Sequence, residues 1–281
     1  MISQLNELCN KIILMDEKIN IIKKNLQKII KSYNIKNNYK KGQQCSINGK
    51  KYEIIIHNIV SKCLINNYNF NFQDKSELGG SSSKNDLICL FNNKKIGIEV
   101  KKYNTPDWMQ CSLKYNNLLK RYEGSKKGKI PIQSRIIFNN LIKDLIIFDN
   151  IIPPFINNNL TYNEWINIKK KTNLFNDIYI NIPNDTIQRL YREKGCHYIQ
   201  ISDEFGLYHL GNDICNFGVP LFKIEQQLRI RIKVHKKKNK SGFCNLSITA
   251  ARQPKNIKKL NKSKNFLDNI NKLPSNLHFI R

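Results

Sequence analysis

The stretch DLICLFNNKKIGIEVK, from Asp86 to Lys101, sets the fold expected of this chain. Two short apolar runs flank Asn92-Asn93, which reads as a tight turn, and this arrangement is typical of a β-hairpin. With a two-residue turn, Asp86 lies directly opposite Glu99, where Cβ atoms are about 5 Å apart. Lys101 follows two positions after Glu99 and therefore projects from the same face of the sheet.

Two carboxylates opposed in this way repel each other, so in a buried hairpin they require a cation between them. Their oxygen atoms favour Mg²⁺, with Mn²⁺ as a substitute. A metal held by Asp86, Glu99 and the backbone carbonyl of Val100 would bind a phosphate oxygen and lower the pKa of a bound water. Lys101 would orient that water and stabilise charge developing on the phosphoryl oxygens. The pattern predicts cleavage of a phosphodiester bond.

The composition points to a polyanionic partner. The 281 residues include 48 Lys and Arg against 21 Asp and Glu, a formal net charge of +27, and the isoelectric point is near 9.8. Such a surface attracts nucleic acid. Codon bias of an AT-rich genome and an anionic membrane surface are the competing explanations. The scarcity of acidic residues favours DNA as the partner.

The chain shows no sign of export or membrane insertion. It has no run of about 18 apolar residues, and its amphipathic start, with Asp16 and Glu17, is not a secretory signal. The eight Cys form no Cys-x-x-Cys pair, which argues against a zinc ribbon. We expect an intracellular protein of the cytoplasm or nucleus, and an AT-rich viral genome is one compatible source.

The run Asp86-x12-Glu99-Val100-Lys101 resembles the motif of the PD-(D/E)XK nuclease superfamily, which has the restriction-endonuclease-like fold. The Gly/Ser loop over 79–83 is similar to the loop before the Asp in archaeal Holliday-junction resolvases, and type II restriction enzymes are the other near group. Asn85 stands where a Pro often precedes the Asp. The resemblance covers about residues 50 to 122.

The resemblance implies further site residues on two predicted helices. Glu53, in a helix over 50–65, occupies the place of a Glu that resolvases carry before the hairpin; an exposed Glu paired with a Lys is the alternative. Gln110, in a helix over 106–122, is similar to the Gln that follows the motif, although its spacing to Tyr115 is one residue longer. We assign nucleic-acid contacts around the motif to Ser81, Ser82, Ser83, Lys84 and Lys102.

Residues 2 to 33 predict one long helix. Its apolar residues alternate steps of three and four, which is a heptad seam. The seam consists of Leu5, Leu8, Ile12, Met15, Ile19, Ile22, Leu26, Ile29 and Tyr33. A coiled coil that forms a homodimer and a helix that lies on its own domain both fit this pattern.

The C-terminal half predicts strands over 197–202, 206–210, 228–235 and 243–249. Residues 228–235 alternate apolar and basic side chains, so one face packs on a core and the other is basic. The basic face contains Arg229, Arg231 and Lys233. This basic face is interpreted as a track, a row of side chains that contact the phosphate backbone of DNA. The alternative is a basic face that only contacts solvent.

Together these features predict an α/β restriction-endonuclease-like fold, with a central mixed sheet flanked by helices. The expected parts are an N-terminal helix over 1–35, a nuclease domain with a β-rich extension over 45–252, and a basic tail over 253–281. The expected function is a Mg²⁺-dependent endodeoxyribonuclease. A non-catalytic basic DNA-binding protein and an RNA nuclease with the same metal site are the alternatives.

Overall fold

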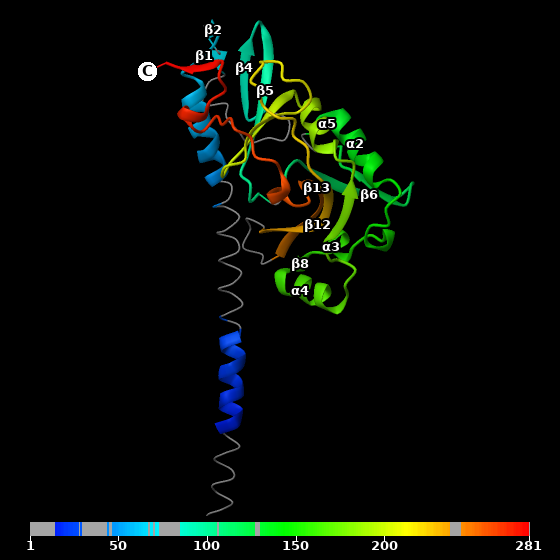
Figure 1. The fold of residues 1–281 in the computed structure, drawn as a ribbon. Coiled ribbons are helices and arrows are strands. Elements are labelled where there is room, and N and C mark those ends of the chain that lie inside the picture. The colour runs from blue at the N-terminus through cyan, green and yellow to red at the C-terminus, as the bar shows by residue number, and fades with distance from the viewer. Residues whose placement is uncertain are drawn as a thin grey trace, which may run out of the picture. The chain divides into compact units, whose positions relative to one another are not determined.

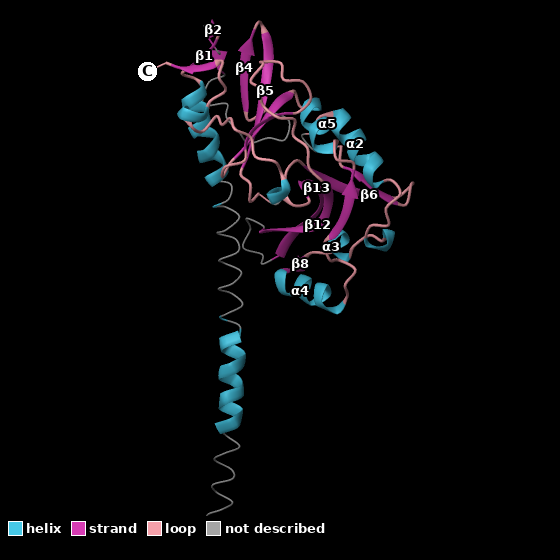
Figure 2. Cartoon of the chain, viewed as in Figure 1, coloured by secondary structure: helices cyan, strands magenta, loops and turns pink. Residues whose placement is uncertain are grey.

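The computed structural model describes residues 15–27, 29, 44, 47–66, 68–69, 71–72, 85–105, 107–126, 130–236 and 243–280. The chain divides into two compact units, Met1–Gly49 (unit 1) and Lys50–Arg281 (unit 2). Helices and strands both contribute to unit 2, which confirms the mixed α/β class (Figure 1, Figure 2). Among the described residues, no helix is both long and apolar enough to span a bilayer.

In unit 1, residues 15–27 and residue 29 are helical, as the heptad pattern predicts. The large apolar side chains of the seam are exposed in this segment, namely Met15, Ile19, Ile22, Leu26 and Ile29. The other seam positions lie outside the described residues. An exposed seam is what pairing with a second helix requires, and the homodimer stays a prediction.

The hairpin predicted from the sequence is present as β4 (Leu87–Phe91) and β5 (Lys94–Lys101). Its register pairs Leu87 with Ile98, as a two-residue turn at Asn92-Asn93 requires. Both asparagines have positive φ, 49° and 61°, the conformation of a type I′ turn that suits the twist of the flanking strands. The predicted turn and register are therefore confirmed.

The hairpin belongs to a central sheet with the order β11-β10-β5-β4-β3. The other strands of this sheet are β3 (Asn71–Phe72), β10 (Cys196–Ile201) and β11 (Gly206–His209). β10 runs parallel to β5, whereas the remaining neighbours are antiparallel. The sheet is thus mixed, and β5 lies between the hairpin partner β4 and the parallel strand β10.

A second sheet has the order β7-β6-β13-β12-β9, with β8 paired to β13, and a third has the order β14-β1-β2. Their strands are β6 (Gln110–Asn116), β7 (Arg121–Gly124), β8 (Leu160–Thr161), β9 (Ile178–Ile182), β12 (Gln226–Lys236), β13 (Phe243–Pro254), β1 (Cys63–Ile65), β2 (Tyr68–Asn69) and β14 (Leu277–Phe279). The helices of unit 2 are an unlabelled one over 50–60, α2 (Ile132–Ile142), α3 (Pro154–Asn157), α4 (Tyr162–Lys171) and α5 (Thr186–Glu193), with 3-10 turns at Phe148–Asn150, Ile257–Lys259 and Ile270–Lys272.

The prediction of a helix over 106–122 is wrong, because this segment contains β6 and the start of β7. In β6, Cys111 and Leu113 are buried, while Ser112 and Lys114, which alternate with them, are exposed. This period of two is the strand pattern, and strand β13 beside it supplies the backbone partners. Leu118 and Leu119, which continue the apparent helical spacing, lie in the turn that separates β6 from β7.

Two other boundaries differ from expectation. The helix predicted over 50–65 ends at residue 60, and the chain then turns into β1. The segment after residue 253, expected to be a weakly patterned basic tail, packs into unit 2. Leu260 and Leu267 are buried there, and β14 pairs with β1. The strands predicted between residues 197 and 249 are all present.

The buried apolar residues form two clusters, one on each face of the central sheet. Ile96, Ile98 and Val100 of β5 pack with the helix over 50–60. Alternate residues of a strand point to opposite faces, so Gly97, Glu99 and Lys101 face the other way, toward α5. The polar end of the hairpin is therefore enclosed by apolar packing on both sides of the sheet.

Candidate active site

Gly97 allows the turn after α5 to approach the hairpin. A Cβ at Gly97 would overlap the carbonyl oxygen of Gly195 and the side-chain amide of Asn85. Gly195 itself has φ +88°, a conformation that glycine adopts without strain. The turn is further held by a hydrogen bond from Asn85 Nδ2 to the Gly195 carbonyl at 3.4 Å. This close approach places the residues on either side of Gly195 next to Glu99.

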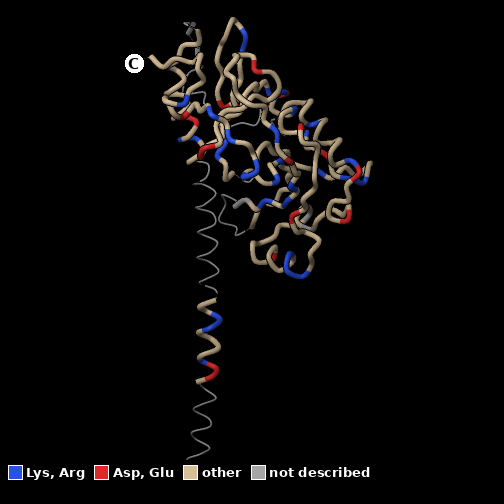
Figure 3. Tube along the Cα trace, viewed as in Figure 1, with Lys and Arg blue, Asp and Glu red and all other residues tan. Residues whose placement is uncertain are grey.

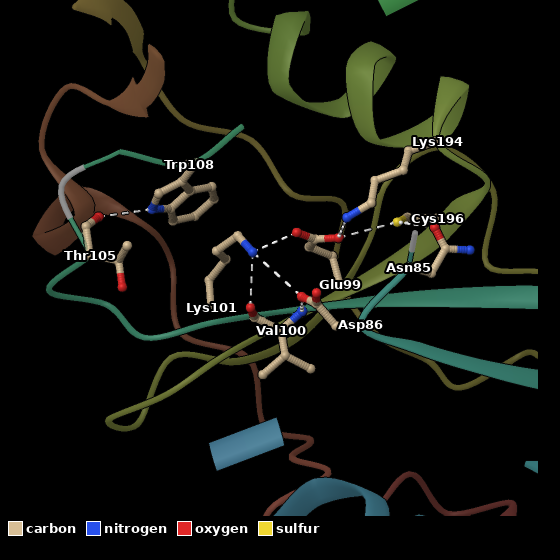
Figure 4. Close-up of polar contacts among 9 residues, drawn as sticks. All are labelled: Asn85, Asp86, Glu99, Val100, Lys101, Thr105, Trp108, Lys194 and Cys196. Carbon is tan, nitrogen blue, oxygen red and sulfur yellow. Dashed lines mark hydrogen bonds and ion pairs between the residues drawn. The ribbon is translucent and has the colours of Figure 1, made fainter. Parts of the chain in front are cut away.

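The two predicted carboxylates and the lysine of the motif form one cluster (Figure 4). Lys101 Nζ lies 2.5 Å from Glu99 Oε1, 3.4 Å from Asp86 Oδ2 and 3.1 Å from the carbonyl oxygen of Val100. The backbone N–H of Val100 also donates to Asp86 Oδ2 at 2.8 Å. The three oxygens that the sequence assigned to a metal therefore converge on a single cationic group.

A second lysine completes the cluster. Lys194, directly after α5, places Nζ 2.7 Å from Glu99 Oε2, and both side chains are buried. The thiol of Cys196 lies 3.5 Å from the same oxygen and 3.2 Å from Asn85 Oδ1. The ring of Tyr191 lies beside both ammonium groups, with its centroid 5.7 Å from Lys101 Nζ and 5.9 Å from Lys194 Nζ.

The charges of the cluster shift one another's pKa values. Burial raises the pKa of Asp86, and the charge of Glu99 raises it further. Burial alone would raise the pKa of Glu99 too, but Lys101 and Lys194 hold it below its ordinary value. Burial lowers the pKa of Lys101, but the charges of Asp86 and Glu99 outweigh this effect and hold the pKa well above its ordinary value. Such mutual shifts are frequent at functional sites, although structural ion pairs also produce them.

Glu53, on the helix over 50–60, belongs to the electrostatic environment of this cluster. Burial, followed by the charge of Asp86, raises the pKa of Glu53 to about 7. Its Oε2 atom is buried, with no hydrogen-bond partner in the described part of the chain. A buried carboxylate oxygen without a donor is costly unless a cation or water reaches it. The structure thus places Glu53 near the predicted carboxylates.

The donor set suits a small hard cation. Among the described residues, no group of three or more His, Cys, Asp and Glu side chains is arranged to hold a metal. The candidate ligands are the Asp86 and Glu99 carboxylates and the Val100 carbonyl, an all-oxygen set that Mg²⁺ completes with water. The ammonium of Lys101 already bridges these oxygens, which shows that they can surround one positive charge.

The other predicted site residues lie elsewhere or outside the described part. Ser81, Ser82, Ser83 and Lys84 are outside the described residues. Lys102 directly follows β5 and is half-buried. Gln110 lies on β6 rather than on a helix. It donates to Asp107 Oδ2 at 3.4 Å and accepts from Lys233 Nζ, so its contacts join it to the second sheet.

The basic strand β12 has the predicted amphipathic character, since Leu228 and Ile230 are fully buried. Its basic side chains are engaged by acids of neighbouring segments. Arg229 pairs with Asp177 at 2.6 Å and with Asp107 at 3.4 Å, and Arg231 pairs with Asp107. Lys and Arg positions are spread over many elements of unit 2 (Figure 3). The phosphate track on β12 stays a prediction, and part of its charge is neutralised within the chain.

Lys194 and Cys196 were not predicted as site residues. They lie 95 or more positions after Glu99 and reach it because β10 is parallel to β5, a long-range pairing. The available signal was Lys194-Gly195-Cys196 between an amphipathic helix and an apolar strand. A glycine after a helix marks its end, but it does not reveal which strand lies next to it.

Comparisons with known proteins add little to this geometry. No family model matches the chain, and no curated protein matches it. A solved structure of HhaI endonuclease in complex with DNA matches with 13% sequence identity and a TM-score of 0.31. The match covers 66% of this chain and 84% of that one. A TM-score this low carries no argument about fold or function.

Proposed function

We propose that unit 2 is a Mg²⁺-dependent endodeoxyribonuclease with a site of the PD-(D/E)XK type. The convergence of Asp86 Oδ2, Glu99 Oε1 and the Val100 carbonyl on one cationic group is the observation that supports it best. These atoms would hold the metal, which when bound supplies a polarised phosphate oxygen and an acidified water. The net charge of +27 suits a nucleic-acid substrate.

The remaining groups act through position and charge. Lys101, partly open to solvent, would move from the carboxylates to the scissile phosphate, where its ammonium stabilises developing negative charge. The hydrogen bond from the Val100 N–H holds the Asp86 carboxylate in place. The apolar clusters on both faces limit water around these groups, which strengthens each electrostatic interaction.

The competing interpretation is a structural ion-pair network in a non-catalytic DNA-binding protein. The pairing of both carboxylates by Lys101 and Lys194 is the observation in its favour. A buried network of this kind can exist for structural reasons, although it is weak evidence for stability. Hydrolysis of DNA separates the two interpretations, because a structural network predicts binding without cleavage.

The test is cleavage of supercoiled plasmid with Mg²⁺, with Mn²⁺ and with EDTA. Asp86→Asn and Lys101→Met keep the shape of each side chain and should abolish cleavage while retaining plasmid binding. Lys262→Met is the matched control, because Lys262 forms an exposed pair with Glu204 at 2.8 Å. Plasmid bound but uncut by the wild type under every condition would overturn the proposal. Preferential cutting of a competing RNA would reassign the substrate.

A further inference from the structure

Lys194 differs from Lys101 in how it meets Glu99. Its side chain is 4% exposed against 17% for Lys101. The backbone N–H of Lys194 bonds to the Tyr191 carbonyl at 3.0 Å, so the residue is anchored to the end of α5. The following Gly195 packs against Gly97. Lys194 is therefore fixed by backbone contacts, whereas the side chain of Lys101 is partly exposed.

The two lysines occupy different oxygens of Glu99. Lys101 binds Oε1 together with Asp86 and the Val100 carbonyl, whereas Lys194 binds Oε2 at 2.7 Å. Withdrawing Lys194 would leave its buried ammonium and Oε2 of Glu99 without each other as partners, which is unfavourable. A cation that enters the cluster can displace Lys101 far more easily than Lys194.

We infer that Lys194 takes the place of a second metal ion, so that the site admits one divalent cation. This inference rests on the proposed function. In two-metal sites the ions lie about 3.5–4 Å apart and share ligands. The Lys194 ammonium occupies Oε2 of Glu99, so Glu99 cannot bridge two ions with its two oxygens. Lys194 is a positioning residue that keeps Glu99 Oε1 directed toward Asp86.

The test is the number of Mn²⁺ ions bound per chain, measured by electron paramagnetic resonance on the full chain without DNA. The wild type and Lys194→Arg should bind one ion, because both keep a cation at Oε2. Lys194→Met should bind a second, weaker ion. Lys101→Met should keep one ion and bind it several-fold more tightly, because the competing ammonium is gone. Lys262→Met should match the wild type.

The measured number of bound ions tests this inference separately from the proposed nuclease function. Two ions in the wild type would overturn the inference and leave the nuclease proposal standing. A Lys194→Met chain that melts cooperatively but binds Mn²⁺ like the wild type would also overturn it. If Lys194→Met does not fold, the count in the wild type and in Lys194→Arg decides alone. No Mn²⁺ bound by the wild type would overturn the metal site and the inference together.

Discussion

Gly97 and Gly195 meet so closely that a Cβ at Gly97 would overlap the carbonyl oxygen of Gly195. The contact joins the second strand of the hairpin to the turn before β10, and both lysine-bearing segments meet there. We expect Gly97→Ala to lower the free energy of unfolding by about 1–3 kcal/mol, because overpacking displaces backbone rather than a flexible side chain. Urea denaturation of the full chain measures this change.

Gly49→Ala is the control for that substitution, since a Cβ at this helical position meets nothing within 4 Å. It should leave stability unchanged or slightly raised, because alanine is the better helix former. If Gly97→Ala were as stable as Gly49→Ala, the close approach at Gly195 would not be part of the folded state.

Glu53 should make stability fall as pH rises. Its pKa is about 7 in the folded chain against 4.5 for a free side chain, so the folded state disfavours the ionised form. The contribution of Glu53 to stability is then largest below pH 4.5 and is lost as pH rises through 7. Glu53→Gln should remove this loss and be more stable at pH 8 by on the order of 1–3 kcal/mol.

Thermal melting of the wild type and Glu53→Gln at pH 5 and pH 8, without divalent cations, checks that sign. Glu204→Gln is the control, because Glu204 is 79% exposed. A Glu53→Gln chain less stable than the wild type at pH 8 would show that the ionised carboxylate has a partner in the fold.

Lys233 should contribute to the salt dependence of DNA binding. Arg229 and Arg231 are paired with acids, but Lys233 contacts the neutral amide of Gln110. If the β12 face follows the phosphate backbone, Lys233→Gln should reduce the slope of log affinity against log salt by about 0.9. Fluorescence anisotropy across a salt series measures it, with Lys262→Gln as the control. Equal reductions in both variants would point to a diffuse charge effect.

The exposed seam of unit 1 predicts a homodimer. In sedimentation at micromolar concentration the wild type should be dimeric, and Leu26→Asp should be monomeric because a charge enters the seam. Ile21 is exposed beside the seam, so Ile21→Asp should leave the dimer intact. A monomeric wild type would remove the dimer from consideration.

The hairpin could be predicted because its information is local. Two apolar runs and a turn of two asparagines determine the register over residues 87–98. Just beyond that register, Asp86 and Glu99 both contact Lys101. The helix prediction over 106–122 was wrong because the apolar positions of β6 and of the turn before β7 together mimic helical spacing. Lys194 could not be predicted, since its contact depends on the parallel pairing of β10 with β5.

The pairing of Asp86 and Glu99 with lysines has a consequence for the order of events after synthesis. In small zinc domains the polypeptide stays unfolded until the ion binds, because metal binding supplies the free energy of folding. Here the chain carries its own counter-charges, Lys101 and Lys194, on the very oxygens concerned. The sheet can therefore fold before any divalent ion binds. Under the proposed function, a chelator should abolish cleavage without unfolding the protein.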